Sequence, residues 1–202
     1  MQNVGLMALH GMGNTDPGYA NAMVASLRGR LGERAAQVHF GAAYYKGILA
    51  PNESRVWDDM VGRATLRYQD LRKFLLFGFA DAAGLENRKE DIGSVYEQAQ
   101  AAIATTLLEA HRANPAMRMV FVSHSLGCQV LSSYLYDAQK KRAGKPVAAG
   151  IWRAIDEWAA RELGRPLTAS EEAFIRGDSC MGWVTTGCNI PIFVAAHKVM
   201  HI

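Results

Sequence analysis

A serine with small neighbours lies where a buried strand is expected to turn directly into a helix. The segment VFVSHSLG, residues 120–127, places Ser125 between Ser123 and Gly127 in a small-x-Ser-x-Gly pattern. Small flanking residues let strand and helix approach closely, and the sharp bend exposes the serine hydroxyl at the helix N-terminus. This pattern is typical of a nucleophile elbow, so we predict that the Ser125 hydroxyl attacks an acyl carbonyl. The alternative is a turn in which Ser125 only caps the helix.

A second motif, HGMG at residues 10–13, directly follows the first apolar run, Val4–Leu9. Acyl transfer needs backbone N–H groups aimed at the oxyanion that forms on the substrate, and glycines let the backbone come close to it. We expect the two donors to be the N–H groups of Met12 and Leu126. The residues expected to support this loop are His10, Gly11 and Gly13. A glycine turn with no catalytic role is the alternative.

Both motifs require parallel strands that end at the same edge of a sheet. The apolar segment 117–123 leads into the elbow and predicts a central strand that is buried on both faces. Further strands are predicted at Val4–Leu9, 37–43 and 183–186. Because helices connect them, we expect parallel pairing, in the spatial order 37–43, Val4–Leu9, 117–123, 183–186. A ligand would then bind at the carboxyl ends of the strands.

Apolar residues spaced three and four apart predict helices between the strands. The expected helices cover residues 19–31, 56–83 as one or two helices, 94–111, 126–141, 151–163 and 170–176, the last opened by Ser170. We therefore predict one α/β domain over residues 1–202, a three-layer α/β/α sandwich with a mostly parallel sheet. Helical insertions at residues 55–85 and 150–177 are expected to form lids. Their apolar residues suit either an acyl chain or the core, and include Leu75, Phe77, Phe79 and Trp152.

Composition argues against several classes of protein. The chain has 202 residues and a formal net charge of +3, with cations scattered along its length, so no nucleic-acid partner is expected. No apolar stretch reaches the ~18 residues that span a membrane, and no cationic leader precedes the first apolar run. Three cysteines, Cys128, Cys180 and Cys188, form neither a metal-binding pattern nor a disulfide framework. We expect a cytoplasmic protein with no metal and no cofactor.

Taken together, the motifs resemble the α/β-hydrolase superfamily, in particular bacterial serine esterase or lipase-like members. These carry HG-x-G after the first core strand and S-H-S-x-G at the elbow. The resemblance spans residues 3–194, and the segment WVTTGCNIP at 183–191 looks like the family strand that follows the elbow helix. Ser123 stands where the first elbow glycine is commoner. The resemblance implies hydrolysis of a small-molecule or acyl carboxylic ester by Ser125.

The family places a triad acid, and then a histidine, after the nucleophile. In this sequence no acidic residue follows Asp178. We expect Asp178 to lie a whole strand away from the elbow and Asp137 to lie three turns down the elbow helix. His124 is expected to pack and His10 to brace the loop. The candidates for the acid and the base are Asp156, Asp178, His197 and His201.

Two explanations for the missing partners belong to different functional classes. In one, the sequence stops before further strands that would supply the acid and the histidine, as its apolar ending FVAAHKVMHI indicates. In the other, the fold has lost catalysis and serves as a binding or assembly module. An enzyme completed by His197 or by a neighbouring subunit is a third reading. A short sheet would leave the 183–186 strand edge uncovered, so a homo-oligomer through that edge or through the C-terminal segment 190–202 is expected.

Overall fold

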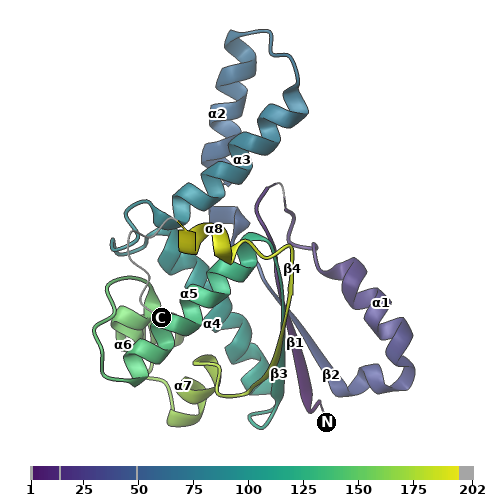
Figure 1. Ribbon diagram of the computed structural model, residues 1–202. Helices are drawn as coiled ribbons and strands as arrows, with labels where there is room; N and C mark the ends of the chain where they lie inside the picture. Colours follow the sequence, from purple (N-terminus) through teal and green to yellow (C-terminus); the bar gives the residue numbers. More distant parts are fainter. Residues whose placement is uncertain (1, 14, 49, 196–202) are drawn as a thin grey trace.

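The computed structural model describes residues 2–13, 15–48 and 50–195, which form helices around one four-stranded sheet (Figure 1). The strands are β1 (Val4–Leu9), β2 (Val38–Ala43), β3 (Arg118–His124) and β4 (Cys180–Thr186). Every pair is parallel and the spatial order is β2-β1-β3-β4. The order and direction predicted from the sequence are confirmed. All four strands therefore end at one edge of the sheet, where the two motifs meet.

Helices connect the strands close to the predicted positions. They are α1 (Asn21–Leu31), α2 (Ala50–Arg63), α3 (Gln69–Glu86), α4 (Val95–Ala113), α5 (Leu126–Arg142), α6 (Ile155–Leu163), α7 (Ala169–Ile175) and α8 (Ile190–Ala195), with short 3-10 turns η1 (Gly32–Gln37), η2 (Lys46–Ile48) and η3 (Ile151–Ala154). The prediction that Ser170 opens α7 is wrong, because Thr168 is the cap and forms a capping box with Glu171. Of the described helices, none combines the length and apolarity needed to cross a membrane.

The two faces of the sheet are covered unequally. Helices α4 and α5 lie over one face, where Met7 and Phe121 are fully buried (Figure 1). The other face carries α1, none of whose residues is buried, and Val184 of β4 is 52% exposed there. The α/β arrangement predicted from the sequence is confirmed. Its second helical layer is thin, and the prediction that helices shield both faces is met only in part.

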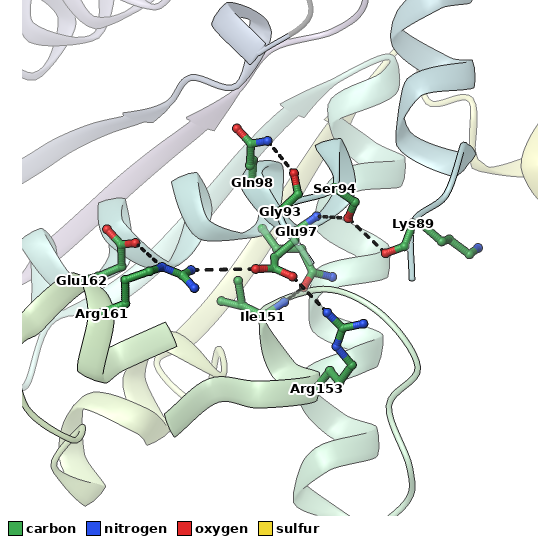
Figure 2. Close-up of polar contacts among 10 residues, drawn as sticks. Lys89, Gly93, Ser94, Glu97, Gln98, Ile151, Arg153, Arg161 and Glu162 are labelled. Atoms are coloured by element: carbon green, nitrogen blue, oxygen red, sulfur yellow. Dashed lines mark hydrogen bonds and ion pairs between the residues drawn. The ribbon is translucent and has the colours of Figure 1, made fainter. Parts of the chain in front are cut away.

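Residues 150–177 pack into the core instead of forming a lid. Trp152, Trp158 and Phe174 are buried in the cluster that also contains the inner residues of α4 and α5. Figure 2 shows the polar attachment, in which Glu97 of α4 lies 3.2 Å from Arg153 and 3.8 Å from Arg161. This segment covers the lower flank of α4 and α5 (Figure 1), so it cannot close over the carboxyl ends of the strands.

Helices α2 and α3 form a hairpin that projects from the edge of the sheet where the strands end (Figure 1). Phe77 of α3 is buried near the base of the hairpin, whereas Leu75 and Phe79 are 42% and 71% exposed. Among the described residues no third element packs along the outer part of the hairpin, and two helices alone can bury only the face between them. The hairpin therefore presents apolar side chains to solvent.

Candidate active site

Ser125 joins β3 to α5 in a backbone conformation that side chains rarely adopt. Its φ is 48° and its ψ is −119°, in a region that favours glycine. A serine held there stores strain of about 1–3 kcal/mol, which persists only where the surrounding structure enforces it. The residue is half-buried and stands at the N-terminus of α5. This strained strand-to-helix bend is the geometry expected of a nucleophile elbow.

Hydrogen bonds from neighbouring elements hold this bend. The N–H of Ser125 donates to the carbonyl of Thr186 at the end of β4, at 2.9 Å. The fully buried Ser123 accepts a hydrogen bond from the indole N–H of Trp183 at 2.7 Å and donates to Sγ of Cys128 at 3.1 Å. A glycine at position 123 would leave the Trp183 indole without this partner. Ser123 therefore ties β3, β4 and α5 together behind the nucleophile position.

Two glycines allow the loop after β1 to touch the elbow. A Cβ added at Gly127 would lie 2.5 Å from the carbonyl oxygen of His10 and 2.9 Å from that of Leu9. A Cβ added at Gly11 would lie 2.9 Å from Cβ of Ser125. Backbone oxygens, and a Cβ that is fixed to the backbone, cannot yield to such contacts without a shift of the strand or the helix. The HGMG loop and the elbow are thus one contiguous structure.

Gly127→Ala is expected to lower the free energy of unfolding by about 3 kcal/mol, because the added methyl group has to displace the end of β1. Denaturant unfolding followed by circular dichroism measures this loss. Gly29→Ala is the matched control, since Gly29 lies within α1 and an added Cβ there meets no atom within 4 Å. The control should stabilise the protein by up to about 1 kcal/mol. If Gly127→Ala were as stable as the wild type, the strand and the helix would not be in this close contact.

The expected oxyanion donors lie on the two sides of this contact. Leu126 is the first residue of α5, so its N–H has no carbonyl partner within the helix. In the loop, Gly13 has a φ of 100° and its N–H donates to Oδ2 of Asp81 at 2.8 Å. Met12 is therefore held between Gly11, which touches the elbow, and Gly13, which is bound to α3. The donor roles of Met12 and Leu126 remain a prediction.

His10 braces the loop from the interior. A carbonyl can only accept, so Nδ1–H donates to the carbonyl of Gly11 at 2.8 Å, while Nε2 accepts the N–H of Tyr45 at 3.2 Å. The imidazole stacks on the Tyr45 ring with a centroid distance of 3.9 Å. Burial lowers the pKa of His10, although the hydrogen bond to Gly11 opposes this shift. A neutral imidazole with both nitrogens bound to the backbone positions the loop and has no nitrogen left to act as a base.

A buried ion cluster attaches the loop to the hairpin, and the sequence analysis missed it. Nζ of Lys46 lies 2.5 Å from Oε2 of Glu53 and 2.7 Å from Oδ1 of Asp81, and the three side chains are at most 8% exposed. The second oxygen of Asp81 accepts the Gly13 N–H. Burial raises the pKa of Glu53, and this effect is larger than that of the hydrogen bond from Lys46, which lowers the pKa. One signal in the sequence could have indicated the cluster. Asp81 stands within an apolar stretch of α3, and a carboxylate that is buried with such a stretch needs a charged partner.

An open cleft of about 390 Å³ lies beside the elbow, on the face of the sheet that carries α1. This volume is within the range of small-molecule sites. Ser125 itself does not line the cleft, but its neighbour His124 and the apposed Gly11 do. The other walls come from the HGMG loop, from the segment before α1 and from α1 itself, and include His10, Met12, Tyr19 and Met23. The cleft therefore adjoins both halves of the candidate site.

A second hollow, of about 440 Å³, lies between the loop after β2, the start of α4 and the end of α6. Its charged groups are already paired, since Glu97 contacts Arg161 and Arg161 contacts Glu162 (Figure 2). No serine, cysteine or histidine of the described chain lines it. We therefore place the candidate active site at the elbow.

Asp178 lies at the wrong end of β4 to serve as a triad acid. It precedes the strand, whose other end contacts Ser125, and seven strand residues span roughly 20 Å. Its carboxylate is 2.5 Å from Arg176, and the hydrogen bond from this guanidinium lowers the pKa of Asp178. Asp178 therefore stabilises the turn before β4.

The other acid candidates are also remote from the elbow. Asp137 accepts hydrogen bonds from Tyr96 at 2.6 Å and from Gln100 at 2.9 Å, so it links α5 to α4. Asp156 is exposed on α6, which Figure 1 places near the C-terminal end of α5. The structure thus brings together Ser125 and the HGMG loop, but it does not bring either carboxylate to them.

The histidines near the elbow have other partners. His124 is exposed, and its Nδ1 is hydrogen-bonded to Oγ1 of Thr186 at 2.9 Å. His111 is hydrogen-bonded to Ser170, far from the elbow. Within residues 2–13, 15–48 and 50–195, no imidazole is hydrogen-bonded to Ser125. The candidates His197 and His201 lie outside the described residues.

Comparison of this chain with protein-family models, with curated proteins and with solved structures finds no match. Among the side chains that the structure describes, no three from His, Cys, Asp or Glu gather in the way that metal ligands do. The features that indicate a function are therefore the bend at Ser125, the HGMG loop and the cleft beside them.

Proposed function

We propose that this protein is a serine hydrolase that acts on carboxylic esters, with Ser125 as the nucleophile and the N–H groups of Met12 and Leu126 as the oxyanion hole. The observation that carries the proposal is the strained backbone of Ser125, with φ 48° and ψ −119°. A cap serine needs no such strain, because capping residues normally have extended backbones. The contact of Gly11 with Ser125, the neighbouring cleft and the resemblance to α/β-hydrolases also support it.

In the proposed reaction, Oγ of Ser125 bonds to the ester carbonyl carbon while its proton passes to a general base. The carbonyl electron pair becomes an oxyanion, which the two N–H groups stabilise. Collapse of this intermediate breaks the bond to the alcohol oxygen, which takes up the proton and leaves an acyl-serine. Water then attacks the acyl group, releasing the carboxylic acid and restoring Ser125. The sequence's candidates for the base are His197 and His201.

Labelling with a fluorophosphonate tests this proposal, because the probe bonds to an activated serine and releases fluoride. We expect one adduct per chain, located on Ser125 by mass spectrometry and suppressed by a short p-nitrophenyl ester. Ser133→Ala is the matched control, since Ser133 lies two turns further along α5 and should not affect labelling. An adduct on any serine other than Ser125, or equal labelling of heat-denatured protein, would contradict the proposal.

The second candidate function is a binding or assembly module built on a hydrolase-like fold. The observation that favours it is the lack of a carboxylate or imidazole hydrogen-bonded to Ser125 among the described residues. The labelling experiment separates the two functions, because a serine without a base is not activated. A folded protein that is not labelled and does not hydrolyse esters would support the binding module.

A further inference from the structure

The outer part of the α2–α3 hairpin combines exposed apolar side chains with cations that form no salt bridge among the described residues. We define the hairpin tip as residues 60–75, which form the end of α2, the connecting turn and the first turns of α3. Tyr68, Leu71 and Phe74 are 78%, 56% and 59% exposed. Seven of the thirteen large apolar residues that are exposed on the described surface belong to α2, α3 or their connection. Exposed apolar side chains concentrated in this way mark an interaction surface.

Three apolar residues of the tip share one face of α3. Leu71, Phe74 and Leu75 have the spacing that places side chains together on a helix. The opposite face of α3 is used within the hairpin, where Lys73 lies over the rings of Trp57 and Phe77. The stripe formed by Leu71, Phe74 and Leu75 therefore does not hold the two helices together, and it is accessible to a partner.

Charge identifies the chemistry of that partner. The tip contains four cations, Arg63, Arg67, Arg72 and Lys73, and one carboxylate, Asp70, so its formal charge of +3 equals that of the whole chain. In the described structure none of these cations takes part in a salt bridge. A second copy of the tip would be repelled by this charge. An anionic partner that also accepts apolar side chains is required.

We propose that the hairpin tip docks on the surface of an anionic lipid bilayer. Basic side chains next to exposed aromatic and aliphatic residues are the combination that binds at such an interface, where the cations meet lipid headgroups and the apolar groups enter the acyl boundary. Figure 1 shows that the tip is the most distant part of the hairpin from the sheet, so a flat surface can reach it without touching the body of the protein. Nucleic acid is the competing partner, because Tyr68 and Phe74 offer rings on which bases can stack. The aliphatic side chains of Leu71 and Leu75, which bases do not use in this way, favour the bilayer. This docking goes beyond the proposed function and does not depend on the chemistry at Ser125.

Co-sedimentation of the full chain with vesicles tests the proposal. We expect binding to phosphatidylcholine vesicles that contain about 30% phosphatidylserine, and weak binding to phosphatidylcholine alone. Arg63→Gln with Arg67→Gln should reduce the partition coefficient about 30-fold, because each cation near the surface contributes about fivefold. The matched control is Arg30→Gln with Arg34→Gln, which removes the same charge from exposed positions on and after α1. It should leave binding nearly unchanged.

A second pair of variants tests the apolar stripe. Phe74→Gln should weaken vesicle binding about tenfold, whereas Ile92→Gln, at a residue 84% exposed outside the tip, should not. Circular dichroism verifies that each variant is folded. Equal losses in the tip and control variants, equal binding to neutral and anionic vesicles, or binding of single-stranded DNA with no binding of vesicles would each overturn the proposal.

Discussion

Replacing Ser125 with alanine should abolish the hydrolysis of short p-nitrophenyl esters, with a loss of about a thousandfold or more in kcat/KM. The reason is that the covalent route disappears, and the oxyanion donors alone accelerate the attack of water only weakly. Steady-state kinetics on protein free of host esterases measures the effect. Activity retained by Ser125→Ala would show that another residue is the nucleophile.

The strained backbone at Ser125 also predicts how substitutions there change the stability of the protein. Ser125→Gly should be as inactive as Ser125→Ala, but about 1 kcal/mol more stable than the alanine variant, because glycine adopts a φ of 48° without steric strain. Thermal or denaturant unfolding compares the two variants directly. An alanine variant as stable as the glycine variant would mean that the bend at Ser125 is not strained.

Lys46→Met should destabilise the protein by about 3–5 kcal/mol, the largest effect on stability that we expect from a single substitution. The change leaves Glu53 and Asp81 buried next to each other without their cation, and an uncompensated buried charge costs far more than a lost surface pair. Denaturant unfolding at neutral pH measures the loss. Asp81 also holds Gly13, so the HGMG loop should become more mobile in the same variant.

Two controls separate this effect from a simple loss of packing. Adding Glu53→Gln and Asp81→Asn to Lys46→Met removes both charges while an amide oxygen can still accept the Gly13 N–H, so most of the stability should return. Burial already raises the pKa of Glu53, which means that the folded state holds protons more tightly than the unfolded state. Stability lost through unpaired carboxylates therefore increases as the pH rises, and the defect of Lys46→Met should be smaller at about pH 5 than at about pH 8. A pH-independent defect that the added changes do not reduce would point to packing.

The sequence predicted the features that depend on local patterns. The apolar run before Ser125 and the small residues around it located the strand-to-helix bend, because both signals lie within residues 117–127. The cap of α7 was misplaced by two residues, at Ser170 instead of Thr168. The stretch TASEE at 168–172 offers two serine or threonine caps, and only the bond from the Glu171 N–H to Thr168 decides between them.

Features that depend on distant residues could not be predicted in the same way. Lys46, Glu53 and Asp81 meet only because the hairpin folds back on the loop after β2, and no spacing in the sequence encodes this contact. Likewise, Phe77 and Phe79 are residues of the same type and stand only two positions apart on α3. One is buried and the other exposed, because the direction of the hairpin determines which face of α3 meets the protein.

The strand order has a consequence for how the molecule folds. In the pairing of β1 with β3, Val4 lies opposite Arg118. The chain must therefore close a very long loop before these two strands meet. Non-local pairing of this kind slows folding, since the entropy lost on closing the loop comes before the contacts that compensate it. The contact between Gly127 and the end of β1 can form only after that step. The two halves of the candidate site are therefore expected to remain apart through most of the folding reaction, and to join only when the central strand pair is complete.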